Sequence, residues 1–158
     1  GMAVGLRNNL VFVTWAGGYR GGVQAFDRDG KLLWSVGRQQ RMMKPMNVAV
    51  NGKGNIFVSD FRSNFIYQYD VTGQYVSKFG GPGVSGGDLS YPGGICADSS
   101  GNILVVDSFN RRVLMYTDQG RFVRNIDVRA EHPTRVAVGP GGQLVVINSD
   151  TITVFPHY

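Results

Sequence analysis

Short runs of four to six apolar residues alternate with polar, glycine-containing turns along the whole chain. Between residues 92 and 127 the apolar runs are GICA, ILVV, VLMY and FVRNI. Runs of this length that are rich in Val, Ile, Tyr and Phe predict β-strands. Runs joined by DRDG, DVTG or TDQG predict hairpins with a glycine at the position of positive φ. No stretch has helical periodicity over three turns, so the pattern predicts an all-β protein.

The pattern repeats. Residues 45–80 align on residues 92–127 without a gap, and NIFVSDFRSNFIYQY in the first matches NILVVDSFNRRVLMY in the second. A further copy, residues 133–158, has a shorter middle loop and stops early, and a more divergent copy covers residues 2–37. A period of about 40–47 residues indicates a propeller or a solenoid.

Each unit contains four predicted strands, apart from the last, which ends after its third. Runs such as ILVV are apolar on both faces of a strand, so both faces need cover. Stacking one four-stranded sheet on the next provides that cover. We therefore predict one domain over residues 1–158, a β-propeller of four-stranded antiparallel blades with units at about 2–37, 45–80, 92–127 and 133–158, the last lacking its outer strand.

The third unit resembles the NHL repeat. The matching positions are Tyr91 to Ile95, Asp98, Gly101 to Ile103, Asp107, Asn110, Arg112, Val113, Tyr116 and Gly120. The glycine-rich linker 78–92 resembles the connector between such repeats. Within that family the chain is most similar to the C-terminal region of tripartite-motif (TRIM) proteins, which are cytoplasmic ubiquitin ligases. The resemblance implies a binding module, with ligase activity in a RING region elsewhere, and a cytoplasmic location.

Propellers of the TRIM kind usually have six blades, and an N-terminal strand normally completes the last one. Here there are four units, and the first opens directly with a first strand, Met2-Ala3-Val4. We therefore expect part of a larger propeller, with a closed four-bladed ring as the alternative. Open sheet edges and an uncovered blade face would favour self-association.

A four-stranded blade places its loops on two rims. One rim receives the loops between second and third strands, predicted at residues 15–22, 60–65, 107–112 and 148–151, together with the connectors between blades. Its basic residues outnumber its acidic residues by nine to six, whereas the opposite rim is balanced. The basic residues are Arg20, Arg38, Arg41, Lys44, Arg62, Arg111, Arg112, Arg129 and Arg135. This rim is the candidate for binding a polyanion.

Asp60 and Asp107 each end a strand immediately before a loop on this rim. We expect their carboxylates to accept hydrogen bonds from the backbone of their own loops. The same rim carries the aromatic residues Trp15, Tyr19, Phe61, Phe65, Tyr91 and Phe109. Arginines interleaved with aromatics can bind phosphates while the rings stack on bases. The structural alternative is that Phe61, Phe65 and Phe109 pack inward between blades and that the arginines form an ordinary solvated rim.

The first hypothesis is that this rim binds single-stranded or hairpin RNA. The predicted site residues are Arg20, Arg38, Arg41, Lys44, Arg62, Arg111, Arg112, Tyr19, Phe61 and Phe109. The alternative is a protein-recognition surface that presents substrates to a ligase without binding RNA.

Catalysis within this chain is not expected. The two histidines, His132 and His157, match no zinc-site spacing, and Cys96 lies in a predicted first strand, where packing is its expected role. Related lyase propellers use histidine-rich metal sites and disulfides, which one cysteine and two histidines cannot supply. We predict no metal, no cofactor and no membrane segment. A single cysteine is typical of a reducing compartment.

Overall fold

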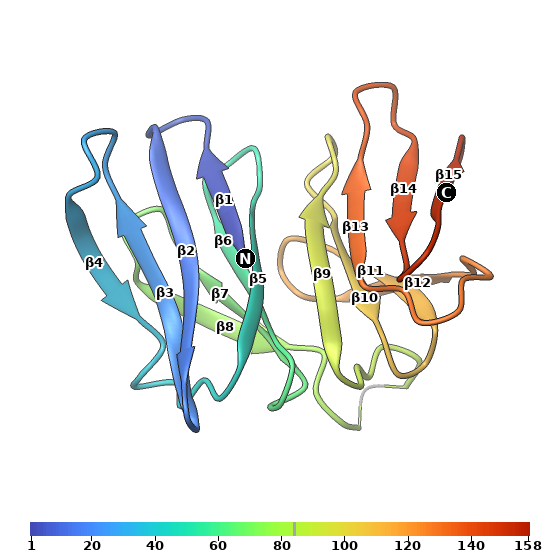
Figure 1. Cartoon of the computed structure of the whole chain (residues 1–158), viewed down its shortest axis with the longest axis horizontal. Helices are drawn as coiled ribbons and strands as arrows, with labels where there is room; N and C mark the ends of the chain where they lie inside the picture. The colour runs from blue at the N-terminus through green and yellow to red at the C-terminus, as the bar shows by residue number, and fades with distance from the viewer. Residues whose placement is uncertain (84) are drawn as a thin grey trace.

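The computed structural model describes residues 1–83 and 85–158, which form fifteen strands in four antiparallel sheets and no helix (Figure 1). The strands are β1 (Met2–Gly5), β2 (Leu10–Gly17), β3 (Arg20–Phe26), β4 (Leu32–Val36), β5 (Pro45–Val50), β6 (Ile56–Asp60), β7 (Phe65–Tyr69), β8 (Tyr75–Phe79), β9 (Pro92–Ala97), β10 (Ile103–Asp107), β11 (Arg112–Tyr116), β12 (Phe122–Ile126), β13 (Arg135–Val138), β14 (Leu144–Ile147) and β15 (Ile152–Phe155).

Each sheet contains consecutive strands paired in chain order. We call them blade 1 (β1–β4), blade 2 (β5–β8), blade 3 (β9–β12) and blade 4 (β13–β15). The first three have four strands and the last has three, which confirms the predicted blades and the missing outer strand. The blades follow one another along an arc that does not close on itself (Figure 1).

The hairpins between third and fourth strands have the same turn in three blades. Gly30, Gly73 and Gly120 adopt φ values of 80°, 84° and 78°. Each donates its N–H to the carbonyl three residues earlier, at 3.0 to 3.1 Å. Residues with a side chain rarely adopt such φ values, so the glycine predicted at this position is required by the turn.

Blades 2 and 3 also share the register of their second and third strands. Asp60 pairs with Phe65, and Asp107 pairs with Arg112, so both loops leave the sheet at the same rim. Blade 1 differs from the prediction: β2 and β3 extend to Gly17 and Arg20, and most of the predicted loop 15–22 is strand. Blade 1 has Thr14 where blades 2 and 3 have Asp60 and Asp107, so this position of blade 1 has no carboxylate to organise a wide loop. In the extended hairpin, three glycines pair across the strands: Gly22 with Trp15, Gly21 with Ala16 and Gly17 with Arg20.

Three apolar clusters fill the spaces between neighbouring blades. Phe12, Ile56 and Tyr69 represent the cluster between blades 1 and 2, Phe57 and Ile103 the next, and Leu104 and Leu144 the third; all are buried. The middle strands β6 and β10 are therefore buried at every position, on both faces. Strands β2 and β14, in the end blades, are not. One face of blade 1 and one face of blade 4 consequently lack a neighbouring blade.

Within the described part of the chain, no helix is long and apolar enough to span a membrane.

Candidate nucleic-acid interface

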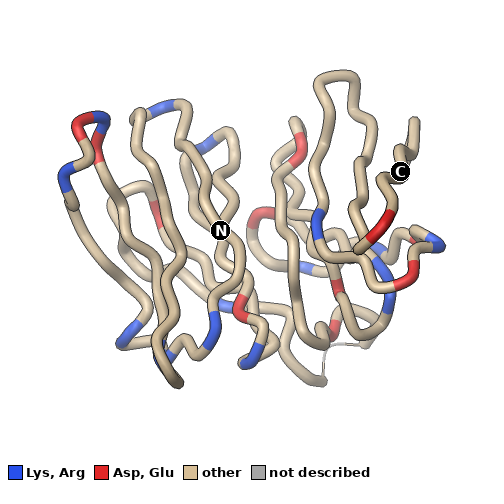
Figure 2. The backbone as a smooth tube through the Cα atoms, viewed as in Figure 1, with Lys and Arg blue, Asp and Glu red and all other residues tan. Residues whose placement is uncertain are grey.

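The loops between second and third strands and the connectors between blades meet at one rim, the lower edge in Figure 1. Hydrogen bonds join them: the Phe61 N–H donates to the Lys44 carbonyl at 2.9 Å, and the Gly21 N–H donates to the Met42 carbonyl at 2.9 Å. The connector between blades 1 and 2 is thus fixed to the loops of both blades. Arginine and lysine positions lie along this edge of the backbone (Figure 2).

Asp60 is the fully buried anchor of the rim in blade 2. Its carboxylate accepts the backbone N–H groups of Met43 at 2.6 Å, Lys44 at 2.8 Å and Arg62 at 3.1 Å. The expected bonds from its own loop are present, and the bonds from the connector are additional. Backbone N–H groups occupy the Asp60 oxygens, and none of the ion pairs in the described residues joins Asp60 to a basic side chain of the rim.

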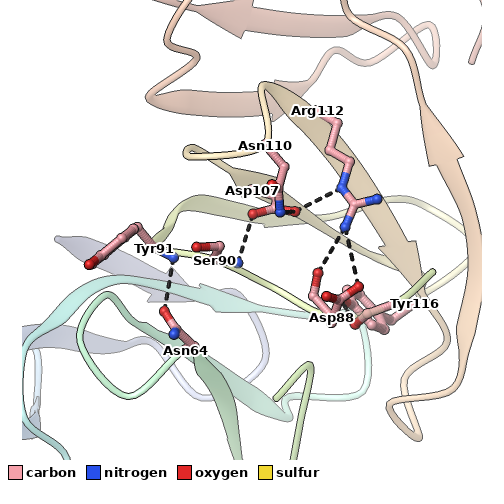
Figure 3. Close-up of polar contacts among 9 residues, drawn as sticks. Asn64, Asp88, Ser90, Tyr91, Asp107, Asn110, Arg112 and Tyr116 are labelled. Atoms are coloured by element: carbon pink, nitrogen blue, oxygen red, sulfur yellow. Dashed lines mark hydrogen bonds and ion pairs between the residues drawn. The ribbon is translucent and has the colours of Figure 1, made fainter. Parts of the chain in front are cut away.

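Asp107 occupies the same position in blade 3 but uses different partners (Figure 3). It accepts the Ser90 backbone N–H at 2.8 Å, the Asn110 side-chain amide at 2.9 Å and the Arg112 Nε at 2.8 Å. The predicted bonds from its own loop are therefore made by side chains rather than by backbone N–H groups.

Arg112 is held inside the protein by two aspartates. Besides Asp107, its Nη2 donates to the Asp88 carbonyl at 2.9 Å and lies 3.6 Å from the Asp88 carboxylate (Figure 3). Only 22% of its side chain is exposed. The guanidinium fixes the connector between blades 2 and 3 to blade 3, so it has little capacity left for an external phosphate.

Five other predicted cations gather around Tyr19, at the tip of the blade 1 hairpin. Two hollows share this ring. One, of about 390 Å³, is lined by Ala16, Gly18, Tyr19, Lys44 and Arg62, and the other, of about 550 Å³, by Tyr19, Arg20, Arg38, Arg41, Met42 and Met43. In the described residues, the ion pairs of basic side chains involve Lys53, Arg112 and Arg129, so no carboxylate neutralises these five.

Three of these cations lie over the faces of aromatic rings. Arg62 lies 5.2 Å above the centroid of Tyr19, Arg38 lies 5.7 Å from Trp15, and Lys44 lies 5.1 Å from Phe61. A cation on a ring face is positioned without losing its charge, so it can still attract a phosphate. On the opposite rim, by contrast, Lys53 is paired with Asp118 at 2.6 Å.

A line of aromatic side chains continues from this cluster toward blade 3. Phe61 lies 4.9 Å from Tyr91, and Tyr91 lies 5.9 Å from Phe109, measured between ring centroids. Tyr91 and Phe109 are 43% and 69% exposed, so Phe109 does not pack inward. Phe65 does pack against the core between blades 1 and 2. Arg111 lies beside Phe109 in sequence and is exposed.

Tyr91 was not among the predicted site residues. It has a φ of 53° and is held by a hydrogen bond from its N–H to the Asn64 side-chain oxygen at 2.9 Å (Figure 3). The alignment of the two middle units indicates Tyr91 as a candidate site residue, because Tyr91 aligns with Lys44, which is a predicted site residue.

Cys96 lies away from this rim and is partly buried. Burial, with a smaller contribution from the Asp98 carboxylate, raises the pKa of its thiol to about 12. Because the thiolate is the reactive form, we expect iodoacetamide at pH 8 to modify native Cys96 at least ~100-fold more slowly than the urea-unfolded chain. Mass spectrometry of timed samples measures both rates, and equal rates would contradict the buried placement. Among the described residues no group of three or more His, Cys, Asp or Glu side chains could hold a metal.

Comparison with known proteins agrees with the repeat. The NHL repeat family model matches residues 89–114. The chain is 30% identical over 114 residues to the protein brain tumor of Drosophila melanogaster, covering 70% of this chain and 11% of that protein. It is 39% identical over 57 residues to the RING finger protein nhl-1 of Caenorhabditis elegans, covering 36% of this chain and 6% of that protein. NHL-repeat-containing protein 4 of Homo sapiens is 33% identical over 67 residues, covering 42% and 54%.

Solved structures share the fold at low sequence identity. Virginiamycin B lyase from Staphylococcus aureus superposes with a TM-score of 0.73 at 18% identity, over 98% of this chain and 54% of that one. A luciferin-regenerating enzyme gives 0.76 at 15%, over 94% and 53%. The chain thus spans about half of these propellers and a small part of the longer curated relatives. Its repeated four-stranded units and these matches show that the chain belongs to the NHL-repeat family of β-propeller proteins.

Proposed function

We propose that this chain is a non-catalytic binding module that binds single-stranded or hairpin RNA at the rim of blades 1 and 2. The observation that carries the proposal is the group of five cations around Tyr19 without a carboxylate partner in the described residues. Phosphates would contact Arg20, Arg38, Arg41, Lys44 and Arg62, and bases would stack on Tyr19 and on the line of Phe61, Tyr91 and Phe109. Arg111 extends this surface. Arg112 remains in its ion pairs with Asp107 and Asp88 and is not one of the proposed phosphate contacts.

The relatives indicate the kind of longer protein in which we place this module. One is a RING finger protein, which is consistent with a TRIM-like ubiquitin ligase as the full-length context. In that setting the chain would recognise the target in the cytoplasm and a RING region would carry the ligase activity. These statements are part of the proposal.

The RNA proposal predicts a steep salt dependence. Five phosphate contacts to a single strand correspond to a slope of about −3.5 in log affinity against log salt. Affinity for a labelled single-stranded RNA of about 12 nucleotides should then fall ~100-fold between about 50 and 200 mM salt. In the Arg38→Ala/Arg62→Ala variant the same change should produce a fall of only about 20-fold, from a weaker starting affinity. Fluorescence anisotropy measures all four values.

The matched control removes the same charge from the opposite rim. Arg7→Ala/Arg28→Ala changes the net charge equally, and both arginines are exposed. Its slope should equal that of the wild type, because its arginines would face away from the RNA. If both variants lose affinity equally, binding is a general effect of net charge, and if the wild type has no salt-dependent affinity, the RNA proposal is wrong.

The second candidate is protein recognition, which the two exposed rings of the aromatic line, Tyr91 and Phe109, favour. Exposed aromatics are typical of protein-binding sites. A photoreactive amino acid at position 109, activated in cells, separates the two functions. Nuclease-sensitive adducts support RNA binding, whereas protease-sensitive adducts that persist in Arg38→Ala/Arg62→Ala support a protein partner.

A further inference from the structure

A groove of about 550 Å³ lies between blades 1 and 2, and we call it the blade 1–2 groove. Its walls come from the end of β4, the connector that follows it, and the hairpin that joins β7 to β8. Arg38, Gln40, Gln74 and Tyr75 are among the residues that line it. Arg38 also lines the hollow at Tyr19. The groove and the surface proposed to bind phosphates therefore meet at one guanidinium.

The matching space between blades 2 and 3 is filled by the protein itself. There the connector, residues 80–91, folds back over the outer strands. The Tyr116 hydroxyl donates to the Gly87 carbonyl at 2.7 Å. Gly86 lies so close to the ring of Phe122 that a Cβ on it would come within 3.2 Å of a ring carbon. Backbone therefore covers both aromatic rings in this pair of blades.

The connector between blades 1 and 2 is too short to do the same. It has eight residues, against twelve in the next connector. Tyr69, which aligns with Tyr116, donates instead to the Gln40 side-chain oxygen at 3.0 Å. Tyr75, which aligns with Phe122, is 43% exposed. The blade 1–2 groove is thus a space that the neighbouring pair of blades fills with backbone and that this pair leaves open beside an aromatic ring.

The groove offers a ring and a polar group without a partner. The rings of Tyr69 and Tyr75 lie 5.9 Å apart, edge to face, so Tyr75 is positioned by the core. Gln74 is exposed, and in residues 1–83 and 85–158 its hydrogen bonds are made only by its backbone. An aromatic ring stacks on an unpaired base, and a glutamine amide donates to and accepts from a base edge. A nucleobase has both the flat face and the edge that these two side chains fit.

We propose that the blade 1–2 groove receives one unpaired nucleobase of the bound RNA, stacked on Tyr75 and hydrogen-bonded to the Gln74 amide. This inference rests on the proposed RNA function and adds a sequence preference to it. Arg38 holds the phosphate of the same nucleotide at the entrance. Phosphate contacts alone carry no sequence information, so a rim that lacked this groove would bind RNAs of different sequence with similar affinity.

The test compares four labelled RNAs of about 12 nucleotides that together present every base. They are oligoadenylate, oligocytidylate, oligouridylate and an alternating guanine–uracil RNA. By fluorescence anisotropy the wild type should bind one of them at least ~10-fold more tightly than the weakest. Gln74→Ala should reduce this ratio to less than ~3-fold. Tyr75→Ala should weaken binding of the preferred RNA ~10-fold, whereas Tyr75→Phe, which keeps the ring, should bind like the wild type.

The matched control is Gln119→Ala, in the corresponding hairpin of blade 3, where the glutamine is also exposed. It should keep the wild-type ratio, and circular dichroism checks that every variant is folded. Equal affinities of the wild type for the four RNAs, an unchanged ratio in Gln74→Ala, or equal losses in Tyr75→Phe and Tyr75→Ala would each overturn the base site. A steep salt dependence would still support RNA binding in those cases. A wild type without salt-dependent affinity would contradict RNA binding itself, and the base site with it.

Discussion

Asp107→Ala is expected to lower the free energy of unfolding by about 3–5 kcal/mol. The substitution removes the fully buried carboxylate that accepts the Ser90 N–H and the Arg112 Nε. It leaves a largely enclosed guanidinium with only Asp88, whose carboxylate is 3.6 Å away and half exposed. Breaking one side of a buried ion pair is costly because the remaining charge has no compensation. Urea unfolding followed by circular dichroism measures the change.

A second substitution identifies the cause. Asp107→Ala/Arg112→Met removes the stranded charge while keeping an apolar stem of similar length. We expect it to recover part of the loss, so that the double variant is more stable than Asp107→Ala alone. If the double variant were instead as unstable as the sum of the two single changes, the Asp107 carboxylate would act through its backbone and amide donors, not through Arg112.

Asp60→Ala is expected to lower the free energy of unfolding by about 2–4 kcal/mol. No cation is involved here. The loss comes from the Met43 and Lys44 N–H groups, whose hydrogen bonds to the carboxylate, at 2.6 and 2.8 Å, are removed. The same loss frees the connector that positions Lys44, so RNA affinity should fall as well. The same urea titration, with the anisotropy measurement, tests both effects.

Two further variants serve as comparisons for Asp60→Ala. Asp60→Asn keeps one acceptor oxygen and should lose about half as much stability. Asp29→Ala removes an exposed aspartate from a turn on the opposite rim and should change stability by less than about 0.5 kcal/mol. An Asp60→Ala protein as stable as Asp29→Ala would show that the connector is not held by this carboxylate.

The sequence predicted the blades well because the signals there are local. A gap-free repeat, apolar runs of strand length and a glycine at each hairpin are sufficient to place β5–β12. The long hairpin of blade 1 was missed for an equally local reason. Its glycines were read as loop residues, whereas Gly17, Gly21 and Gly22 pair across the ladder.

The rim was harder to predict because its contacts are not local. The charge count singled out one rim but treated every arginine alike. Arg112 aligns with Phe65, so the repeat gives no sign that its charge is neutralised. That neutralisation depends on Asp88, which is 24 residues earlier in the connector. The placement of Arg38, Arg41, Lys44 and Arg62 around one tyrosine likewise depends on how the connector folds back on blade 1.

The same bulge recurs near the end of the third strand in blades 1, 2 and 3, at Ala25/Phe26, Gln68/Tyr69 and Met115/Tyr116. In the part of the chain that the structure describes, the apolar clusters join each blade to its immediate neighbours through equivalent positions. A unit duplicated or deleted as a whole would thus find compatible surfaces on both sides. Genes encoding such chains can accordingly gain or lose entire blades by recombination, while a cut within a unit would separate strands that depend on one another.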